Sequence, residues 1–180
     1  MANIFGSIGE PSRAQEVIAE LVKRIMGYAV GATKALVPDN GPRTLPILWV
    51  HIFFNYQWVD RVASKVLGAG RPSFMDSLRG ALDNEIKTAL YSHLEPPQCQ
   101  RAVDGLNEAL DGFMLEFAEY GAPASQGAVK GTLFWEFGKK VANMLGHVDQ
   151  AFMITAIAGN TMAGVKAMDV PGLLRTLTTA

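Results

Sequence analysis

The histidines of the chain, His51, His93 and His147, are the residues best suited to bind a ligand chemically. Imidazole is the commonest side-chain ligand for metal ions, and it can also hold the iron of haem. Other ligand types lie near them in the chain: Glu95, Cys99 and Asp149. Imidazole, thiolate and carboxylate together form the ligand set for zinc, iron or copper. A metal or haem site is therefore one hypothesis that these side chains allow.

No catalytic motif of recognised spacing accompanies the histidines. The sequence contains no HExxH, CxxC or GxSxG pattern, and no Glu-x-x-His pairs of the kind found in di-iron bundles. Residues 159–167 imitate a phosphate-binding loop, but one residue separates Gly164 from Lys166, and Ala167 stands where a magnesium-binding hydroxyl is needed. We therefore assign no catalytic residue and expect a protein that is not an enzyme.

The stretch that must position such a site is residues 45–67, which is too apolar to lie on a surface. Between residues 45 and 54 the only polar side chain is His51. Aromatic residues crowd into the same region: Trp49, Phe53, Phe54, Tyr56 and Trp58. A helix that is apolar on nearly every side is normally the buried member of a helical domain. The pattern predicts a central helix enclosed by the rest of the chain.

Amphipathic patterns on both sides of this stretch predict its neighbours. Apolar residues recur at intervals of three and four in four further segments: residues 13–37, 73–93, 99–120 and 133–145. Residues 151–168 are expected to form a sixth helix, and Asp169 with Pro171 begins a short final turn. Short connections make neighbouring helices antiparallel. We expect an all-α fold in one domain, residues 1–180: an up-and-down bundle of five main helices organised around the buried central helix, with the sixth at the C-terminus.

Certain side chains are placed to cap these helices. Ser12 and Gln15 have the spacing of a capping box, Thr44 precedes the central helix, and Ser73 precedes the third helix. Two glycines, at positions 27 and 31, lie in the first helix, where glycine normally lowers helix stability. Either another helix packs closely against them, or they soften the end of the helix.

The expected topology gathers the histidines. If helices two to five alternate in direction, the start of the second, the end of the third and the end of the fifth lie at one end of the bundle. His51, His93 and His147 all fall there and could together bind a metal ion. The alternative is that His51 is a core residue hydrogen-bonded to Asn55 or to a backbone carbonyl. His93 would then be favoured only by a helix C-terminus, and His147 would be a solvated loop residue.

Aromatic residues form a belt on the second and fifth helices of the predicted bundle. A pocket for haem or another flat apolar ligand would be lined by rings beside His51 and His93: Trp49, Phe54, Trp58 and Trp135. The same rings can simply fill the core, as aromatic residues commonly do. Both interpretations fit the pattern.

Charge and cysteine content limit the kinds of partner and the compartment that the sequence predicts. The 180 residues include 16 basic and 17 acidic ones, so no net field would recruit nucleic acid or an anionic membrane. A single cysteine argues for a reducing compartment. Neither a signal-like N-terminus nor an apolar stretch of spanning length is present in the sequence. These features favour a soluble, cytoplasmic protein.

An apolar content of 49%, with eight methionines, suits a chain that buries more than its own core. We therefore expect a non-enzymatic protein that acts by binding or by self-assembly. Its homo-oligomer would form through helix–helix contacts, with the first or the fourth helix as the contact surface. The alternative is a helical domain that binds a metal ion, haem or another apolar ligand through the grouped histidines.

Overall fold

The fold is entirely helical in the part of the chain that the structure, a computed structural model, describes: residues 11–121 and 130–178. Its elements are, in order, α1 (Arg13–Leu36), α2 (Thr44–Val66), the 3-10 helix η1 (Gly68–Gly70), α3 (Arg71–Leu90), α4 (Pro96–Glu116), α5 (Leu133–Met144), α6 (Ala151–Ala167) and α7 (Val170–Arg175). The predicted all-α class is confirmed, together with the C-terminal helix and the short final one. The glycine, proline and serine residues of the stretch 121–127 predict a loop, and apart from Gly121 this stretch lies outside the described residues.

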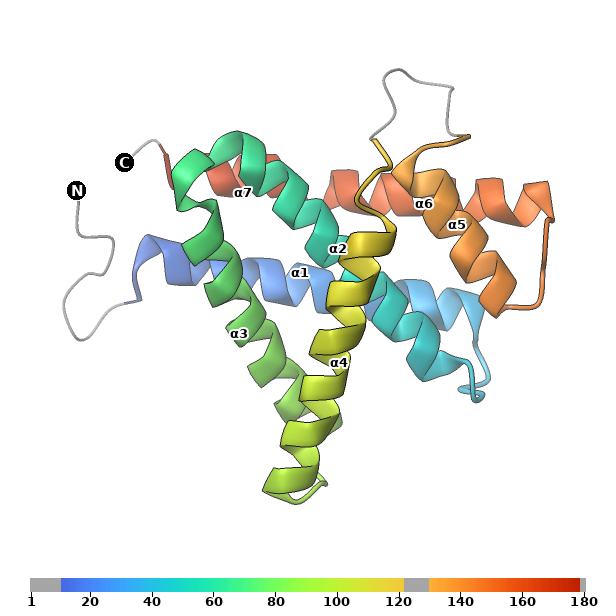
Figure 1. Ribbon diagram of the computed structural model, residues 1–180, viewed down its shortest axis with the longest axis horizontal. Coiled ribbons are helices and arrows are strands. Elements are labelled where there is room, and N and C mark those ends of the chain that lie inside the picture. Colours follow the sequence, from blue (N-terminus) through green and yellow to red (C-terminus); the bar gives the residue numbers. More distant parts are fainter. Residues whose placement is uncertain (1–10, 122–129, 179–180) are drawn as a thin grey trace.

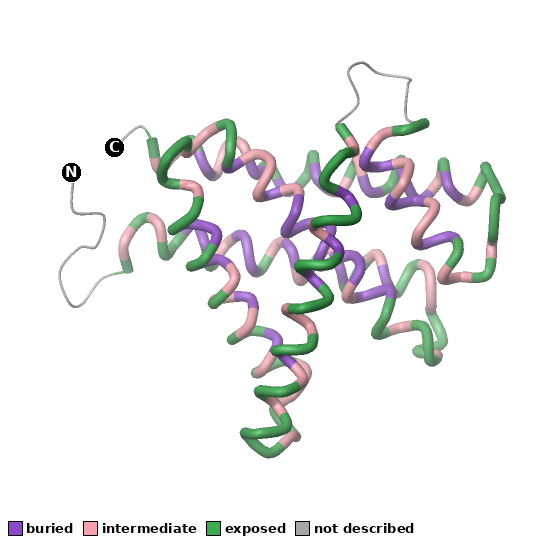
Figure 2. The backbone as a smooth tube through the Cα atoms, in the orientation of Figure 1, coloured by how far each residue is buried: buried purple, intermediate pink, exposed green. Residues whose placement is uncertain are grey.

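α2 runs through the middle of the molecule and contacts α1, α3, α4, α5 and α7 (Figure 1). Every residue over positions 50–57 is buried. This part of α2 is the purple stretch near the centre of the molecule in Figure 2. Burying one large apolar side chain stabilises the fold by roughly 1.5–3 kcal/mol. The prediction of an enclosed central helix is therefore confirmed.

The helices cross one another instead of lying along one common axis. α1 and α6 run across the view of Figure 1, whereas α3 and α4 form a hairpin that lies across them. The α3–α4 turn points to the bottom of this view, and the α5–α6 turn lies at its right-hand end. The chain reverses direction at each of these two turns, as expected, but the paired helices are inclined to one another and the turns point in different directions.

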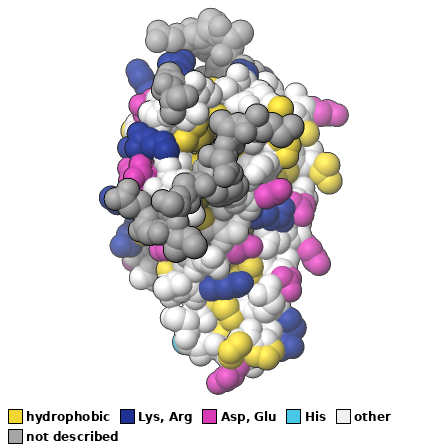
Figure 3. Space-filling view, turned by 90° about the vertical axis from the view of Figure 1, so that its left-hand side faces the viewer, with side chains coloured by type: hydrophobic (Ala, Val, Ile, Leu, Met, Phe, Trp, Pro, Cys, Tyr) yellow, Lys and Arg dark blue, Asp and Glu magenta, His cyan; other side chains and the backbone are white. Residues whose placement is uncertain are grey.

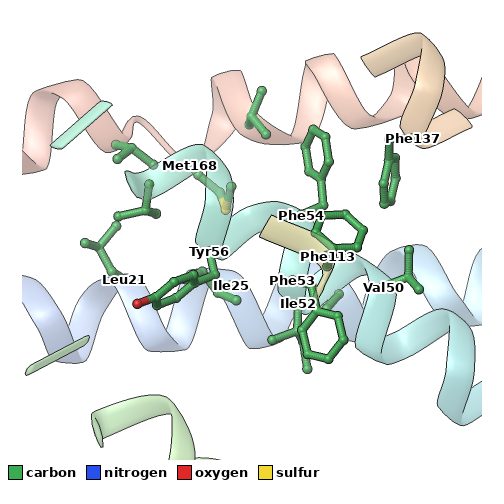
Figure 4. Packing of buried hydrophobic residues seen from close by; sticks show 14 of the residues in the cluster. Leu21, Ile25, Val50, Ile52, Phe53, Phe54, Tyr56, Phe113, Phe137 and Met168 are labelled. Carbon is green, nitrogen blue, oxygen red and sulfur yellow. The ribbon is translucent and has the colours of Figure 1, made fainter. Parts of the chain in front are cut away.

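Aromatic rings from α2, α4 and α5 meet at the centre of the core (Figure 4). The ring centroid of Phe54 lies 4.3 Å from that of Phe137, and the Phe53 centroid lies 5.9 Å from that of Phe113. Such ring pairs contribute roughly 0.5–1.5 kcal/mol beyond the area that they bury. α4 supplies the regular apolar stripe expected from the sequence, with these residues buried: Val103, Leu110, Phe113 and Phe117. On the outside, charged side chains of both signs lie among hydrophobic ones (Figure 3).

The helix caps agree only in part with the sequence predictions. The capping box at the start of α1 is present, because the Ser12 amide donates to Gln15 Oε1 at 2.7 Å and the Gln15 amide donates to Ser12 Oγ at 3.3 Å. The predicted cap at Thr44 is wrong, since α2 begins at that residue and no side chain caps it. The predicted cap at Ser73 is also wrong. α3 begins two residues earlier, directly after η1, so Ser73 lies inside the helix.

Arg61 ties the C-terminal end of α4 to α2. Its guanidinium donates to the backbone carbonyl of Tyr120 at 2.5 Å and to that of Phe117 at 2.6 Å. The last carbonyls of a helix lack partners within the helix, so Arg61 satisfies two acceptors near this end. The amide of Leu133, at the start of α5, donates to the carbonyl of Gly121 at 2.9 Å. The two ends of the segment between α4 and α5 are therefore held side by side.

The two glycines of α1 do not mark a close helix contact. A Cβ atom built on Gly27 or on Gly31 would meet no other atom within 4 Å. The prediction that another helix packs tightly against them is therefore wrong. Close approaches occur instead at Gly138 of α5 and Gly164 of α6.

Candidate functional site

His51 lies in an apolar cage between three helices. Its side chain is 1% exposed, and its ring meets Tyr28 of α1 at 5.8 Å and Phe137 of α5 at 5.1 Å between centroids, both edge to face. Neither ring nitrogen has a hydrogen-bond partner in the described part of the chain. Burial lowers the pKa of His51 to about 4, so the imidazole is neutral at neutral pH.

His51 lies in the core, as one interpretation predicted, but its ring does not make the predicted hydrogen bond to Asn55 or to a backbone carbonyl. Asn55 Nδ2 donates to the backbone carbonyl of His51 at 2.8 Å, which leaves the imidazole ring without this partner. Further atoms along α2 are buried without a partner among the described residues: Asn55 Oδ1, Gln57 Oε1 and Trp58 Nε1. Each such atom costs roughly 1–3 kcal/mol relative to a satisfied one. The buried face of α2 therefore carries several polar groups that the surrounding helices do not satisfy.

The other two histidines lie in different surroundings from His51. His93 is exposed in the α3–α4 turn, and His147 is half-buried in the α5–α6 turn. Over residues 11–121 and 130–178, no three His, Cys, Asp or Glu side chains are grouped so that they could hold a metal ion. The crossing of the helices explains this result, because the turns that a parallel bundle would gather point in different directions. The structure thus does not bring the three histidines together.

The predicted ligand-binding aromatics pack against other rings. Phe54 is fully buried, and the half-buried Trp58 lies 5.4 Å from Phe134 between centroids. Trp49 is half-buried and its ring lies 6.2 Å from that of Tyr91 at the end of α3. The remaining candidate on α5, Trp135, is also half-buried. This arrangement is typical of core residues at the junction of helices.

An open groove of about 300 Å³ lies where α2, α3 and α4 meet. Two bidentate ion pairs form its walls. Arg71 donates to Asp60 at 2.6 and 2.8 Å, and Arg79 donates to Asp111 at 2.8 and 3.1 Å. Because each guanidinium already binds a carboxylate of the same chain, the groove has no arginine left to attract an anion.

A second groove, of about 410 Å³, lies between the end of α4 and α5. Its lysines are also paired, Lys140 with Glu116 at 2.5 Å and Lys139 with Glu136 at 2.8 Å. The Lys140 ammonium lies 5.7 Å from the centroid of the Phe117 ring as well. None of the residues predicted to bind a ligand lines either groove.

α6 exposes a largely uncharged surface that the sequence predictions missed. One side of α6 packs against α5, and the opposite side faces outward. We call this opposite side the α6 outer face: Phe152, Thr155, Gly159, Asn160 and Ala163. No charged residue occurs in the sequence between positions 150 and 165, and Phe152 is 82% exposed. The long uncharged run was the signal for such a surface, but periodicity alone did not reveal which side would be covered.

Comparisons with protein-family models, with curated proteins and with solved structures found no match for this chain. Its function must therefore be inferred from its own residues. Within the described ranges, no helix combines the length and the apolar character that crossing a membrane requires.

Proposed function

We propose that the protein acts by self-association, through contact of the α6 outer face with the same face of a second copy. One observation carries this proposal. α6 is apolar on nearly all sides, yet the chain covers only the side that packs on α5 and on Tyr28 of α1. A helix that is apolar all round is normally buried all round. A second copy supplies the missing cover.

The chemistry of the α6 outer face favours a second copy of the same chain as the partner. In a twofold contact each residue group meets its own equivalent, so a face with charges of one sign would repel itself. Over residues 151–165 the α6 outer face carries no charge, with Lys166 only at its C-terminal edge, and it contains one large anchor, Phe152, beside the small residues Gly159 and Ala163. Aromatic anchors in well-packed contacts supply most of the energy of protein interfaces. Small residues let two helix backbones approach closely.

The part of α1 that contacts α6 through Tyr28 also exposes uncharged residues, and Lys34 is exposed one turn beyond them. Tyr28 of α1 lies against Gly164 of α6, where an added Cβ atom would be 2.0 Å from the tyrosine ring. Gly27, Val30 and Gly31 of α1 are exposed on the same half of that helix. Contact with a second copy would therefore bury part of α1 together with α6.

The outer sides of the other long helices are less suited to contact with a copy of themselves. The exposed side of α4 carries acidic residues at successive turns: Asp104, Glu108 and Asp111. The first half of α1 carries exposed charges, including Arg13, Glu16 and Lys23. Like charges opposed across a twofold axis cost binding energy. α6 therefore replaces the first and fourth helices as the favoured surface.

Light scattering across a concentration series tests this proposal with a matched pair of variants. Phe152→Ser removes the proposed anchor, whereas Leu115→Ser removes an equally exposed apolar residue from α4, with 78% exposure against 82%. We expect the wild type and Leu115→Ser to associate alike, and Phe152→Ser to dissociate at concentrations at least tenfold higher. A wild type that stays monomeric at millimolar concentration, or equal behaviour of the two variants, would contradict the proposal.

A further inference from the structure

α5 and α6 form a unit that packs more closely on itself than on the rest of the molecule. A Cβ atom on Gly138 of α5 would lie 2.6 Å from the carbonyl oxygen of Ile154 in α6, so the two backbones are in direct contact. Toward α2, by contrast, α5 presents aromatic rings: Phe137 against His51, and Phe134 against Trp58. At these positions the hairpin rests on α2 through ring packing, and at the end of α5 the guanidinium of Arg43, which precedes α2, donates to the Leu145 carbonyl at 2.6 Å.

The surface of α2 beneath this hairpin contains polar atoms without partners. Both ring nitrogens of His51 and the Nε1 atom of Trp58 are buried there, and no described residue accepts from them or donates to them. Water would satisfy all three atoms if the hairpin moved away. Release of the hairpin therefore costs the ring contacts of Phe134 and Phe137 with α2, but it lets water bind the nitrogen atoms of His51 and Trp58.

We propose that protonation of His51 releases the α5–α6 hairpin from α2, so that the hairpin is a pH-sensitive element of the fold. The geometry supports this directly, because the imidazole is covered by Phe137 of α5 and has no acceptor for the proton that it would gain. A buried charge without a partner is among the most costly defects in a protein interior.

The groups that face His51 from each packed helix do not offset this charge. α1 contributes Tyr28, whose pKa burial raises and whose hydroxyl hydrogen-bonds to Thr161 of α6, so both side chains are neutral. α5 contributes the Phe137 ring. On α2 itself the nearest polar neighbour one turn on is the neutral Asn55. Burial is the cause that lowers the His51 pKa, and no charged group among the described residues opposes it.

The remainder of the molecule has contacts of its own that do not involve the hairpin. α1 packs along α2, and α7 packs on α2. The junction between α6 and α7 is held to α1, because Arg24 donates to the carbonyl of Met168 at 2.6 Å. We therefore expect the hairpin to separate from α2 while the junction at Met168 stays in place.

Hydrogen exchange of the full chain, read by mass spectrometry at pH 7 and pH 5 and corrected for intrinsic rates, tests the inference. A histidine that titrates near pH 6.5 when released and at about 4 when covered favours release about 20-fold more at pH 5 than at pH 7. We expect this increase in opening for α5 and α6 amides, and little change for α1 and α2. His51→Phe should abolish the increase. His93→Gln and His147→Gln should keep it, because these side chains lie outside the cage.

Two results would overturn the inference. The first is an unchanged acid response in His51→Phe, which would assign the effect to other groups. The second is equal loss of protection in all helices, which would indicate global unfolding instead of release of one hairpin. If His51→Phe does not fold, His51→Gln replaces it and is read in the same way. The inference does not depend on self-association, since every variant compared retains the α6 outer face.

Discussion

α2 and α6 are the two most apolar helices of the described chain, but their surroundings differ. α2 is enclosed by five other α-helices, and every residue over positions 50–57 is buried. α6 is covered by α5 on one side and leaves Phe152 82% exposed on the other. An apolar composition therefore shows that a helix needs cover without showing where the cover comes from. For α2 it comes from the same chain, and for α6 we propose a second copy.

Replacing one phenylalanine on each of these two helices by alanine should give the largest difference in the free energy of unfolding. Phe54→Ala leaves a cavity among the rings of Phe134 and Phe137 and should lower the free energy of unfolding by about 3–5 kcal/mol. Phe152→Ala removes an exposed ring and should change the stability of the monomer by less than about 0.5 kcal/mol. Urea unfolding at low protein concentration measures both. Similar losses for the two variants would show that the ring of Phe152 is covered within its own chain.

Protonation of His51 on α2 should give the next largest effect, a loss of unfolding free energy at acid pH. Its folded pKa of about 4 lies below the ordinary value of 6.5, so the unfolded chain binds a proton that the folded chain rejects. Stability from this source is fully present above pH 6.5 and is lost as pH falls toward 4, by up to about 3 kcal/mol. The difference in unfolding free energy between wild type and His51→Phe, measured at several pH values, isolates this contribution. A constant difference from pH 7 to pH 4 would show that the ring is hydrated in the folded protein.

A glycine-to-alanine change should destabilise the protein where α5 and α6 pack against each other. Gly138→Ala would place a methyl group 2.6 Å from the Ile154 carbonyl oxygen and force the two backbones apart. We expect a loss of about 1–3 kcal/mol in the free energy of unfolding. Thermal unfolding followed by circular dichroism measures it. An unchanged melting temperature would show that α5 and α6 are farther apart than described.

The same change on the α6 outer face should have the smallest effect and the opposite sign. A Cβ atom on Gly159 would meet no atom within 4 Å, so alanine would only remove the cost of glycine in a helix. Gly159→Ala should stabilise the monomer by about 0.5–1 kcal/mol in urea unfolding at low concentration. A loss of stability would mean that another part of the same chain covers this face.

Burial patterns were readable from the sequence because they depend on which residue types recur along the chain. The apolar residues around His51 predicted a buried helix, and the spacing of Leu110 and Phe113 predicted the buried side of α4. The capping box at Ser12 was also local and was predicted correctly. Thr44 failed as a cap because the chain enters α2 one residue earlier than the apolar pattern implies, with Arg43 in the cap position.

The geometry between helices was not readable from the sequence in the same way. Crossing angles follow from how side chains of two helices interdigitate, and periodicity does not encode them. The expected grouping of His93 and His147 with His51 depended on parallel axes, and it failed when the helices crossed. The same limit applies to glycine. Gly27 and Gly138 both lie inside predicted helices, but only Gly138 has a neighbouring backbone against it.

The contacts made by Arg61 and Gly121 have a practical consequence for protein engineering. Arg61 holds the end of α4 and the Gly121 carbonyl accepts from Leu133 in α5, so contacts outside the intervening segment hold its two ends side by side. Lengthening a loop with anchored ends costs only about 0.6 kcal/mol for each doubling. This position is therefore the natural place to insert a peptide tag or a small reporter domain without disturbing the helices around it.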